Sequence, residues 1–147
     1  RFEPNRTITR EEFLKLLVSA LDLPLTDKAE LTFGDVPQDA WYYDYIAAAV
    51  ALGITNGQSA SSFGTGSPIS RQDMCVMTVK AAAIKNITLT SQETNFADSA
   101  QIASYAKDSV NTLFGSGVIS GYGDNSFNPE GQSSRAEAVT VLYRLLH

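Results

Sequence analysis

The sequence predicts an all-α fold built by repetition of one helical unit. The pattern Phe-x7-Arg occurs three times, from Phe2 to Arg10, from Phe63 to Arg71 and from Phe127 to Arg135. Each Arg opens a run of residues that is apolar over much of a helix circumference. The polar–apolar alternation that is typical of β-strands is absent. A pattern that recurs in this way indicates one supersecondary unit used repeatedly.

The repeated unit is longer than this core pattern. Five pairs of identical residues lie 64 positions apart, namely Asp44 and Asp108, Gly53 and Gly117, Gly57 and Gly121, Phe63 and Phe127, and Arg71 and Arg135. Because Arg71 follows Phe33 by 38 positions, a complete first copy would begin before residue 1. The sequence therefore predicts one domain that holds the second half of a first copy (1–32) and two whole copies (33–95 and 96–147).

Three helices should form the core of the domain. Thr9-x-x-Glu12, Ser70-x-x-Asp73 and Ser134-x-x-Glu137 each read as a capping box, so helices should begin at the following Arg and run to about Asp22, Lys85 and Leu146. Helices that are apolar over most of their surface belong in a protein interior. We expect the three to pack as a central bundle.

Two outer helices are expected at about 39–52 and 103–116. In the first, Trp41, Tyr45, Ala48, Ala49 and Leu52 have the spacing of one buried face. Gly53 and Gly117 should end these helices in a left-handed conformation. Gly57 and Gly121 should then form tight turns, and Phe63 and Phe127 should fix the loops to the core.

The composition excludes several classes of function. The net charge of −5 and the pI near 4.7 argue against nucleic acid and anionic membranes as partners. No stretch approaches the roughly 20 apolar residues of a membrane span. The single Cys75 cannot form an internal disulfide, and neither a metal-ligand cluster nor a nucleophile–base set is present. The sequence therefore predicts a protein that is not an enzyme and that needs no metal and no cofactor.

The ordered motifs resemble the S-layer homology (SLH) family. Copy two carries Phe33-Gly-Asp35-Val36, Trp41, Gly53-Ile54-x-x-Gly57, Phe63 and Ile69-Ser70-Arg71-x-Asp73; copy three carries Phe96-x-Asp98, Gly117-Val118-x-x-Gly121, Phe127-x-Pro129 and Ser134-Arg135-Ala136-Glu137. The resemblance implies three units in pseudo-threefold symmetry around a central helical bundle, with outer helices and loops as prongs. It also implies a non-covalent anchor of an exported protein at the bacterial cell surface or in an S-layer. The implied ligand is a secondary cell-wall polysaccharide, in many cases a pyruvylated amino sugar held in grooves between units.

Arg10, Arg71 and Arg135 are the leading candidates for binding residues. Each occupies the first position of its helix, where the helix dipole disfavours a cation by about 0.3–1 kcal/mol. A helix N-terminus and a guanidinium together suit a carboxylate, such as that of a pyruvate ketal. The hypothesis is that each Arg pairs with the ligand acid. The alternative is that each pairs with Glu12, Asp73, Glu137 or another acid of the protein, or merely covers apolar surface with its aliphatic stem.

The other candidates also have two interpretations. Trp41 and Tyr105 could offer a flat face to a sugar ring, or could pack in the core. Asp35 and Asp98 could accept hydrogen bonds from sugar hydroxyls, but a turn cap is the favoured interpretation. Gly57 and Gly121 serve backbone geometry, and their amides could also line a groove.

The expected function is thus binding of wall polysaccharide, with peptidoglycan as the other possible wall ligand. The alternative is a protein–protein or self-assembly module of a surface layer. The oligomeric state stays open, because a neighbouring chain could supply the outer helix that copy one lacks.

Overall fold

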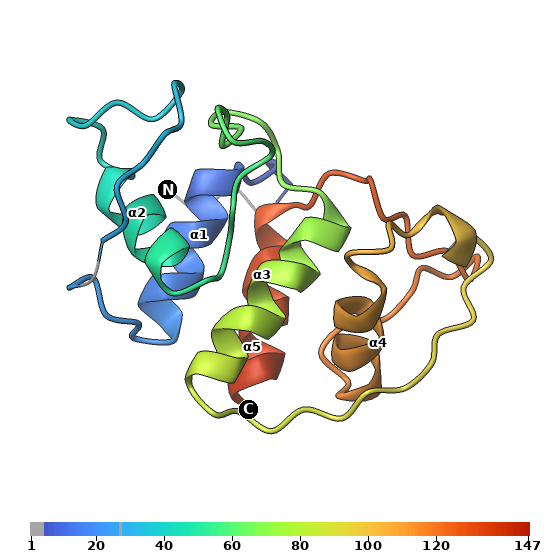
Figure 1. The fold of residues 1–147 in the computed structure, drawn as a ribbon. Coiled ribbons are helices and arrows are strands. Elements are labelled where there is room, and N and C mark those ends of the chain that lie inside the picture. Colours follow the sequence, from blue (N-terminus) through green and yellow to red (C-terminus); the bar gives the residue numbers. More distant parts are fainter. Residues whose placement is uncertain (1–4, 27) are drawn as a thin grey trace.

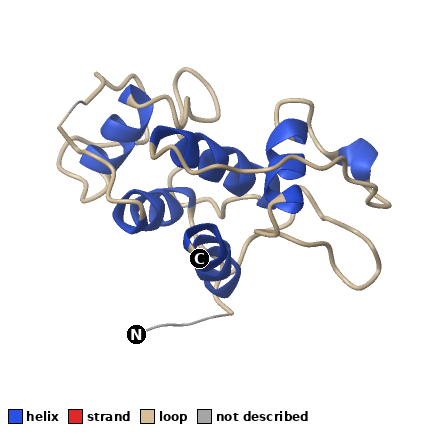
Figure 2. Ribbon diagram, turned by 90° about the horizontal axis from the view of Figure 1, so that it is seen from below, coloured by secondary structure: helices blue, strands red, loops and turns tan. Residues whose placement is uncertain are grey.

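The described part of the chain consists of helices joined by turns and loops. The computed structural model describes residues 5–26 and 28–147. It contains α1 (Arg10–Ala20), α2 (Tyr43–Ala51), α3 (Arg71–Ile84), a 3-10 helix η1 (Ser99–Gln101), α4 (Lys107–Gly115) and α5 (Arg135–Leu146). Between the described residues there are isolated β-bridges but no strand (Figure 2). The prediction of an all-α fold is confirmed.

The three core helices begin at the predicted residues. Figure 1 shows α1, α3 and α5 beside one another, with α2 outside α1 and α4 outside α3. Thr9 with Glu12, and Ser134 with Glu137, form complete capping boxes. In α3 the Ser70 hydroxyl accepts from the Asp73 N–H, but the Asp73 carboxylate is bound elsewhere. Local capping chemistry therefore sets where each core helix starts.

The outer helices are shorter than expected. They begin at Tyr43 and Lys107, about four residues after the predicted starts, and neither has a side-chain cap. Consecutive backbone turns from Pro37 to Ala40 and from Ala40 to Tyr43 occupy the segment before α2. Trp41 lies in this segment with 54% of its surface exposed, so its assignment to a buried helix face was wrong. Ala48 and Ala49 are fully buried on α2 as expected.

Aromatic rings and close-fitting glycines hold the loops after the outer helices. Phe63 and Phe127 are completely buried, as predicted. Gly53 and Gly117 end α2 and α4 at positive φ. A Cβ on Gly57 would lie 2.6 Å from the Phe33 ring, and one on Gly121 would lie 2.5 Å from the Phe96 ring. These two glycines are thus required by a close approach of the backbone to a buried ring.

A closed ring of backbone hydrogen bonds joins the three copies. Ile8, Ile69 and Ser133 occupy the same position, two residues before the first Arg of each core helix. The Ile8 N–H donates to Ser133, the Ser133 N–H to Ile69, and the Ile69 N–H to Ile8, over 2.9–3.1 Å. A second cycle runs from the N–H groups of Arg10, Arg71 and Arg135 to the carbonyls of Ser67, Gly131 and Arg6 respectively. The three helix N-termini are thereby related cyclically, while pseudo-threefold symmetry of the whole domain stays a prediction.

The glycine fit gives a stability prediction. Gly121→Ala should lower the free energy of unfolding by about 1–3 kcal/mol, because the new methyl group would overlap the Phe96 ring and the Ser126 carbonyl. Gly123→Ala is the matched control, since a Cβ there meets no atom within 4 Å. Urea unfolding of the two variants measures the difference. Equal stabilities would contradict the close fit at Gly121.

Candidate functional site

Three open grooves lie between the copies. Each groove contains the Arg at the first position of one core helix, and beside it the acidic residue at the third position of the next core helix. Groove A holds Arg10 and Asp73 and has a volume of about 620 Å³. Groove B holds Arg71 and Glu137 and measures about 260 Å³. Groove C holds Arg135 and Glu12 and measures about 410 Å³. The cyclic backbone contacts at the helix N-termini bring each Arg to the acid of a neighbouring copy.

In groove A the guanidinium of Arg10 is fixed on two sides. Its Nε donates to the Phe63 carbonyl at 2.9 Å, and its Nη1 donates to Asp73 Oδ2 at 2.7 Å. It also lies over the Phe63 ring, 5.1 Å from the centroid, and the residue is only 3% exposed. In the described part of the chain Nη2 has no hydrogen-bond partner, and binding of a ligand acid by Arg10 stays a prediction.

Groove B repeats this arrangement around Arg71. Its Nε donates to the Phe127 carbonyl at 2.7 Å, its Nη1 pairs with Glu137, and its Nη2 lies 3.3 Å from the Ser120 carbonyl. The guanidinium stacks between Tyr122 and Phe127, 4.6 and 4.8 Å from the ring centroids. Arg71 is therefore more fully occupied by protein groups than Arg10 is.

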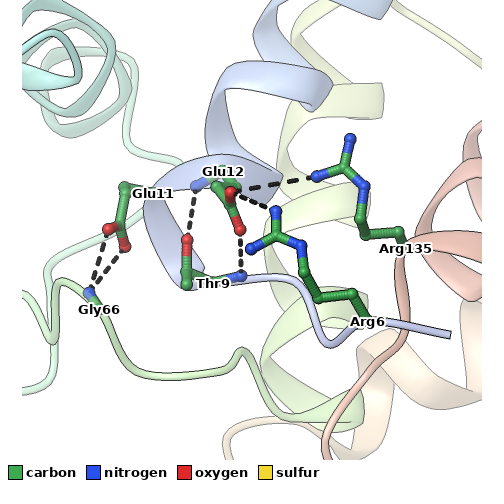
Figure 3. A network of polar contacts seen from close by, with 6 residues as sticks. All are labelled: Arg6, Thr9, Glu11, Glu12, Gly66 and Arg135. Atoms are coloured by element: carbon green, nitrogen blue, oxygen red, sulfur yellow. Dashed lines mark hydrogen bonds and ion pairs between the residues drawn. The ribbon is translucent and has the colours of Figure 1, made fainter. Parts of the chain in front are cut away.

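Groove C has a looser ion pair, drawn in Figure 3. Arg135 lies 4.0 Å from Glu12 Oε2, and Arg6 donates to the same oxygen at 2.8 Å. Partial burial raises the pKa of Glu12, but hydrogen bonds from Thr9 and Arg6 outweigh burial and hold that pKa below its ordinary value. The neighbouring Glu11 carboxylate accepts the Gly66 N–H. Phe2, whose counterparts Phe63 and Phe127 bind Arg10 and Arg71, lies outside the described residues.

These contacts agree with the alternative interpretation of the three Arg residues, since each approaches an acid of the next copy. They do not test the hypothesis that the same residues bind a ligand acid. Arg10 and Arg71 are buried and paired, so replacing either one leaves a carboxylate and a backbone carbonyl without their donor. Loss of binding in such variants would therefore be mixed with loss of stability.

Asp35 and Asp98 hold the loops that carry the Arg-binding carbonyls. Asp35 accepts the N–H groups of Phe63, Gly64 and Thr65 at 2.8–2.9 Å. Asp98 accepts those of Phe127 and Asn128. Burial raises the pKa of Asp35, but these N–H donors outweigh it and lower the pKa to about 2; the same balance lowers that of Asp98. The contacts agree with the favoured interpretation as turn caps, and a role in sugar binding stays a prediction.

Trp41 and Tyr105 present exposed aromatic faces in two of the grooves. Trp41 lines groove C, and the Lys15 ammonium lies 5.3 Å from its ring centroid. Tyr105 lines groove A, is 62% exposed, and donates its hydroxyl to Asp73 Oδ1 at 2.6 Å. Partial burial and the Asp73 carboxylate raise the pKa of Tyr105 to about 12. Both rings are thus exposed rather than packed in the core, and their contact with a ligand stays a prediction.

The glycines named above also belong to grooves. Gly57 lines groove A and Gly121 lines groove B. The Gly57 N–H donates to the Thr55 hydroxyl at 3.1 Å, which shapes the turn.

Several residues that line the grooves were not predicted from the sequence. Gln72, Lys80 and Glu130 line groove A, Tyr122 and Arg144 line groove B, and Lys15 lines groove C. Gln72 is buried, and its Oε1 accepts the Ala103 N–H at 2.9 Å, which joins α3 to the segment before α4. One signal was available: Lys80 and Arg144 are both basic and lie 64 positions apart, nine residues after Arg71 and Arg135.

The described residues contain no group of three His, Cys, Asp or Glu placed to hold a metal ion. Within the same residues, no helix has the length and apolar character needed to cross a membrane.

The carboxylate cap gives a pH-dependent prediction. Asp35→Asn should destabilise the fold by about 1–3 kcal/mol at neutral pH. The NH₂ group of the new asparagine is itself a donor, so it cannot accept the backbone N–H groups that the Asp35 carboxylate now accepts. The pKa of Asp35 is lower in the folded than in the unfolded chain. Its contribution to the free energy of unfolding is therefore present above pH 3.8 and is lost as the pH falls toward about 2.

Urea unfolding of the wild type and the variant over this pH range measures the effect, with the exposed Asp39→Asn as control. A difference between wild type and Asp35→Asn that does not change with pH would contradict the assignment.

Comparison with known proteins identifies the family. The model of the S-layer homology domain matches residues 32–75 and 95–139. The "Surface-layer 125 kDa protein" of Lysinibacillus sphaericus is 32% identical over 148 residues, which cover 99% of this chain and 12% of that protein. The "S-layer protein sap" of Bacillus anthracis is 29% identical over 141 residues, which cover 96% of the chain and 17% of that protein.

Enzymes with the same module also match. The "Amylopullulanase" of Thermoanaerobacterium thermosulfurigenes is 31% identical over 150 residues, which cover 99% of this chain but only 8% of that protein. The chain thus spans less than a fifth of each of these relatives, and the enzyme match is confined to this part. The conserved module is a non-catalytic one for anchoring at the cell surface or in an S-layer, and the chain belongs to the S-layer homology domain family.

Proposed function

We propose that the chain binds an acidic secondary cell-wall polysaccharide in the grooves between its copies. The observation that carries this proposal is the composition of groove A, where Arg10, Lys80 and the exposed Tyr105 ring face one space beside the turn at Gly57. Arginine and lysine suit an acidic substituent, and an aromatic face suits the apolar side of a sugar ring. This mixture of charge and flat surface in groove A supports a pyruvylated amino sugar as the ligand.

The Arg10–Asp73 pair supports the proposal because it holds the guanidinium in one orientation before a ligand binds. A side chain that is already fixed loses little conformational entropy on binding. Gln72 Nε2 lies 3.5 Å from Glu130 Oε1, and these two side chains add polar groups for the hydroxyl and amide substituents of a sugar. A neutral glucan has no acidic substituent to offer to the Lys80 ammonium of this groove, and we expect it to bind weakly.

A second function, assembly of a surface layer through protein contacts, is favoured by one observation. Val139, Tyr143 and Leu146 are exposed on one face of α5. Self-assembly through this face predicts a mass that rises with protein concentration in the absence of polymer. A constant monomer mass would exclude it.

The test of polysaccharide binding is co-sedimentation with purified cell-wall sacculi before and after acid extraction of the secondary polymer. Binding that disappears on extraction supports the proposal. Binding that survives extraction identifies peptidoglycan as the ligand and contradicts it, as does an absence of binding to intact sacculi.

Tyr105→Ala should weaken polymer binding about two- to tenfold, since an aromatic contact contributes about 0.5–1.5 kcal/mol. The residue is exposed, so folding should be retained. Tyr143→Ala is the matched control, because Tyr143 is also exposed but lines none of the three grooves. Titration with purified polymer measures both affinities. Equal affinities for the two variants would remove Tyr105 from the site.

A further inference from the structure

The turn that follows α2 contains the dipeptide Asn56-Gly57. Among the asparagines of the sequence, Asn56 alone is followed by glycine. The backbone nitrogen that follows an asparagine can attack the carbon of the side-chain amide, which closes a five-membered ring. A side chain on the attacking residue hinders this approach, and glycine has none. Asn56 is therefore the asparagine with the least hindered path to this reaction.

The fold leaves the Asn56 side chain unrestrained. Asn56 is exposed, and among the described residues its side-chain amide has no hydrogen-bond partner. The Gly57 N–H donates to the Thr55 hydroxyl at 3.1 Å, so the attacking nitrogen lies outside the backbone hydrogen bonds of α2. The Asn56 amide is thus free to turn toward the Gly57 nitrogen.

The packing of the turn requires glycine at position 57. Gly57 has a φ of 81°, and a Cβ there would lie 2.6 Å from the Phe33 ring and 2.9 Å from the Ser62 carbonyl. The residue that permits the attack is thus one that the fold cannot exchange. Copy three has the same constraint at Gly121, but Ser120 precedes it. The reactive dipeptide is therefore confined to copy two.

Asn125 is a restrained asparagine in the corresponding loop of copy three. It is also exposed. Its Nδ2 donates to the Asn95 carbonyl at 3.2 Å. The residue that follows it is Ser126, whose N–H donates to Asp124 Oδ1 at 3.1 Å. Asn125 is therefore an internal control for Asn56, with similar exposure but a held amide and a hindered nitrogen.

We propose that Asn56 is a site of spontaneous deamidation. The Gly57 nitrogen loses its proton to solvent and forms a bond to Asn56 Cγ; the Cγ–Nδ2 bond breaks, and the amide nitrogen takes up a proton and leaves as ammonia. Water then opens the cyclic imide at one of its two carbonyls. Opening at Cγ gives aspartate, and opening at the backbone carbonyl gives isoaspartate, in which the main chain runs through Cβ and Cγ. The overall reaction consumes water, releases ammonia and involves no oxidation or reduction.

Deamidation changes the charge of groove A, which Asn56 lines. The charged side chains that line this groove are the cations Arg10 and Lys80 and the acids Asp73 and Glu130, which balance. Either product adds a carboxylate at position 56 and makes the lining net negative, so that an acidic polymer meets like charge. The weaker binding of an acidic polymer rests on the proposed function, whereas the modification itself does not.

Peptide mass spectrometry of the folded chain, incubated at mildly alkaline pH, tests the modification. We expect Asn56 to convert at least ten times faster than Asn125, at a rate that rises with pH because the attacking nitrogen must lose its proton. A smaller ratio between the two rates overturns the proposal. So does a rate at Asn56 that is more than tenfold slower than in the chain unfolded in urea, since the turn would then protect the amide.

Asn56→Ser is the matched variant for the effect on binding, because it places the residue of copy three at this position. Wild type and variant are titrated with purified wall polymer before and after incubation. We expect the affinity of the wild type to fall at least threefold and that of the variant to stay constant. Equal affinities of fresh and deamidated wild type overturn the effect on groove A and leave the modification site intact. Absence of polymer binding by the fresh chain counts against the proposed function alone.

Urea unfolding gives a second readout, which needs no polymer. Isoaspartate adds a methylene group to the main chain beside the Phe33 ring, where the turn fits closely. We expect incubation to lower the unfolding midpoint of the wild type and to leave that of Asn56→Ser unchanged. An unchanged midpoint of wild type that contains isoaspartate would overturn the effect of the modification on the turn.

Discussion

The cyclic backbone contact among the three helix N-termini is the constraint on which the rest of the structure depends. It joins residues 8, 69 and 133, which are far apart in the sequence, through three mutual hydrogen bonds. Because each core helix begins two residues later, the contact fixes the relative position of the three N-termini. Each Arg then lies beside the acid of the next copy, and a groove forms at each boundary.

The acids at the third helical position have two tasks, and the balance between them differs among the copies. Glu12 and Glu137 are long enough to accept their own cap's N–H and also to approach an Arg. Asp73 is shorter, and its two oxygens bind Arg10 and Tyr105 instead. Helix α3 therefore has no complete capping box, and Asp73 instead holds the Arg10 guanidinium and the Tyr105 hydroxyl in groove A.

Much of the fold was predictable from short motifs. The starts of α1, α3 and α5 followed from the hydroxyl at each cap, since a cap acts on N–H groups only three residues away. A role of Asp35 as a cap for backbone N–H groups was also accessible from the residue type. Which N–H groups it binds was not, because those of Phe63, Gly64 and Thr65 lie 28–30 positions away. The starts of α2 and α4 were not, because neither helix has a side-chain cap to mark its first residue. Trp41 was misplaced for the same reason: its spacing fits a helix face, but the helix begins after it.

By itself, the sequence determined the repeated unit, the three capped helices and the all-α class, because these depend on interactions within a few residues. Only the tertiary structure decided which acid meets which Arg, since Arg10 and Asp73 lie 63 positions apart and Arg71 and Glu137 lie 66 apart. It also decided that Tyr105 of copy three enters the groove between copies one and two, and that the apolar face of α5 stays open. Such relations depend on how the helices pack around the cyclic contact, and no local pattern encodes that packing.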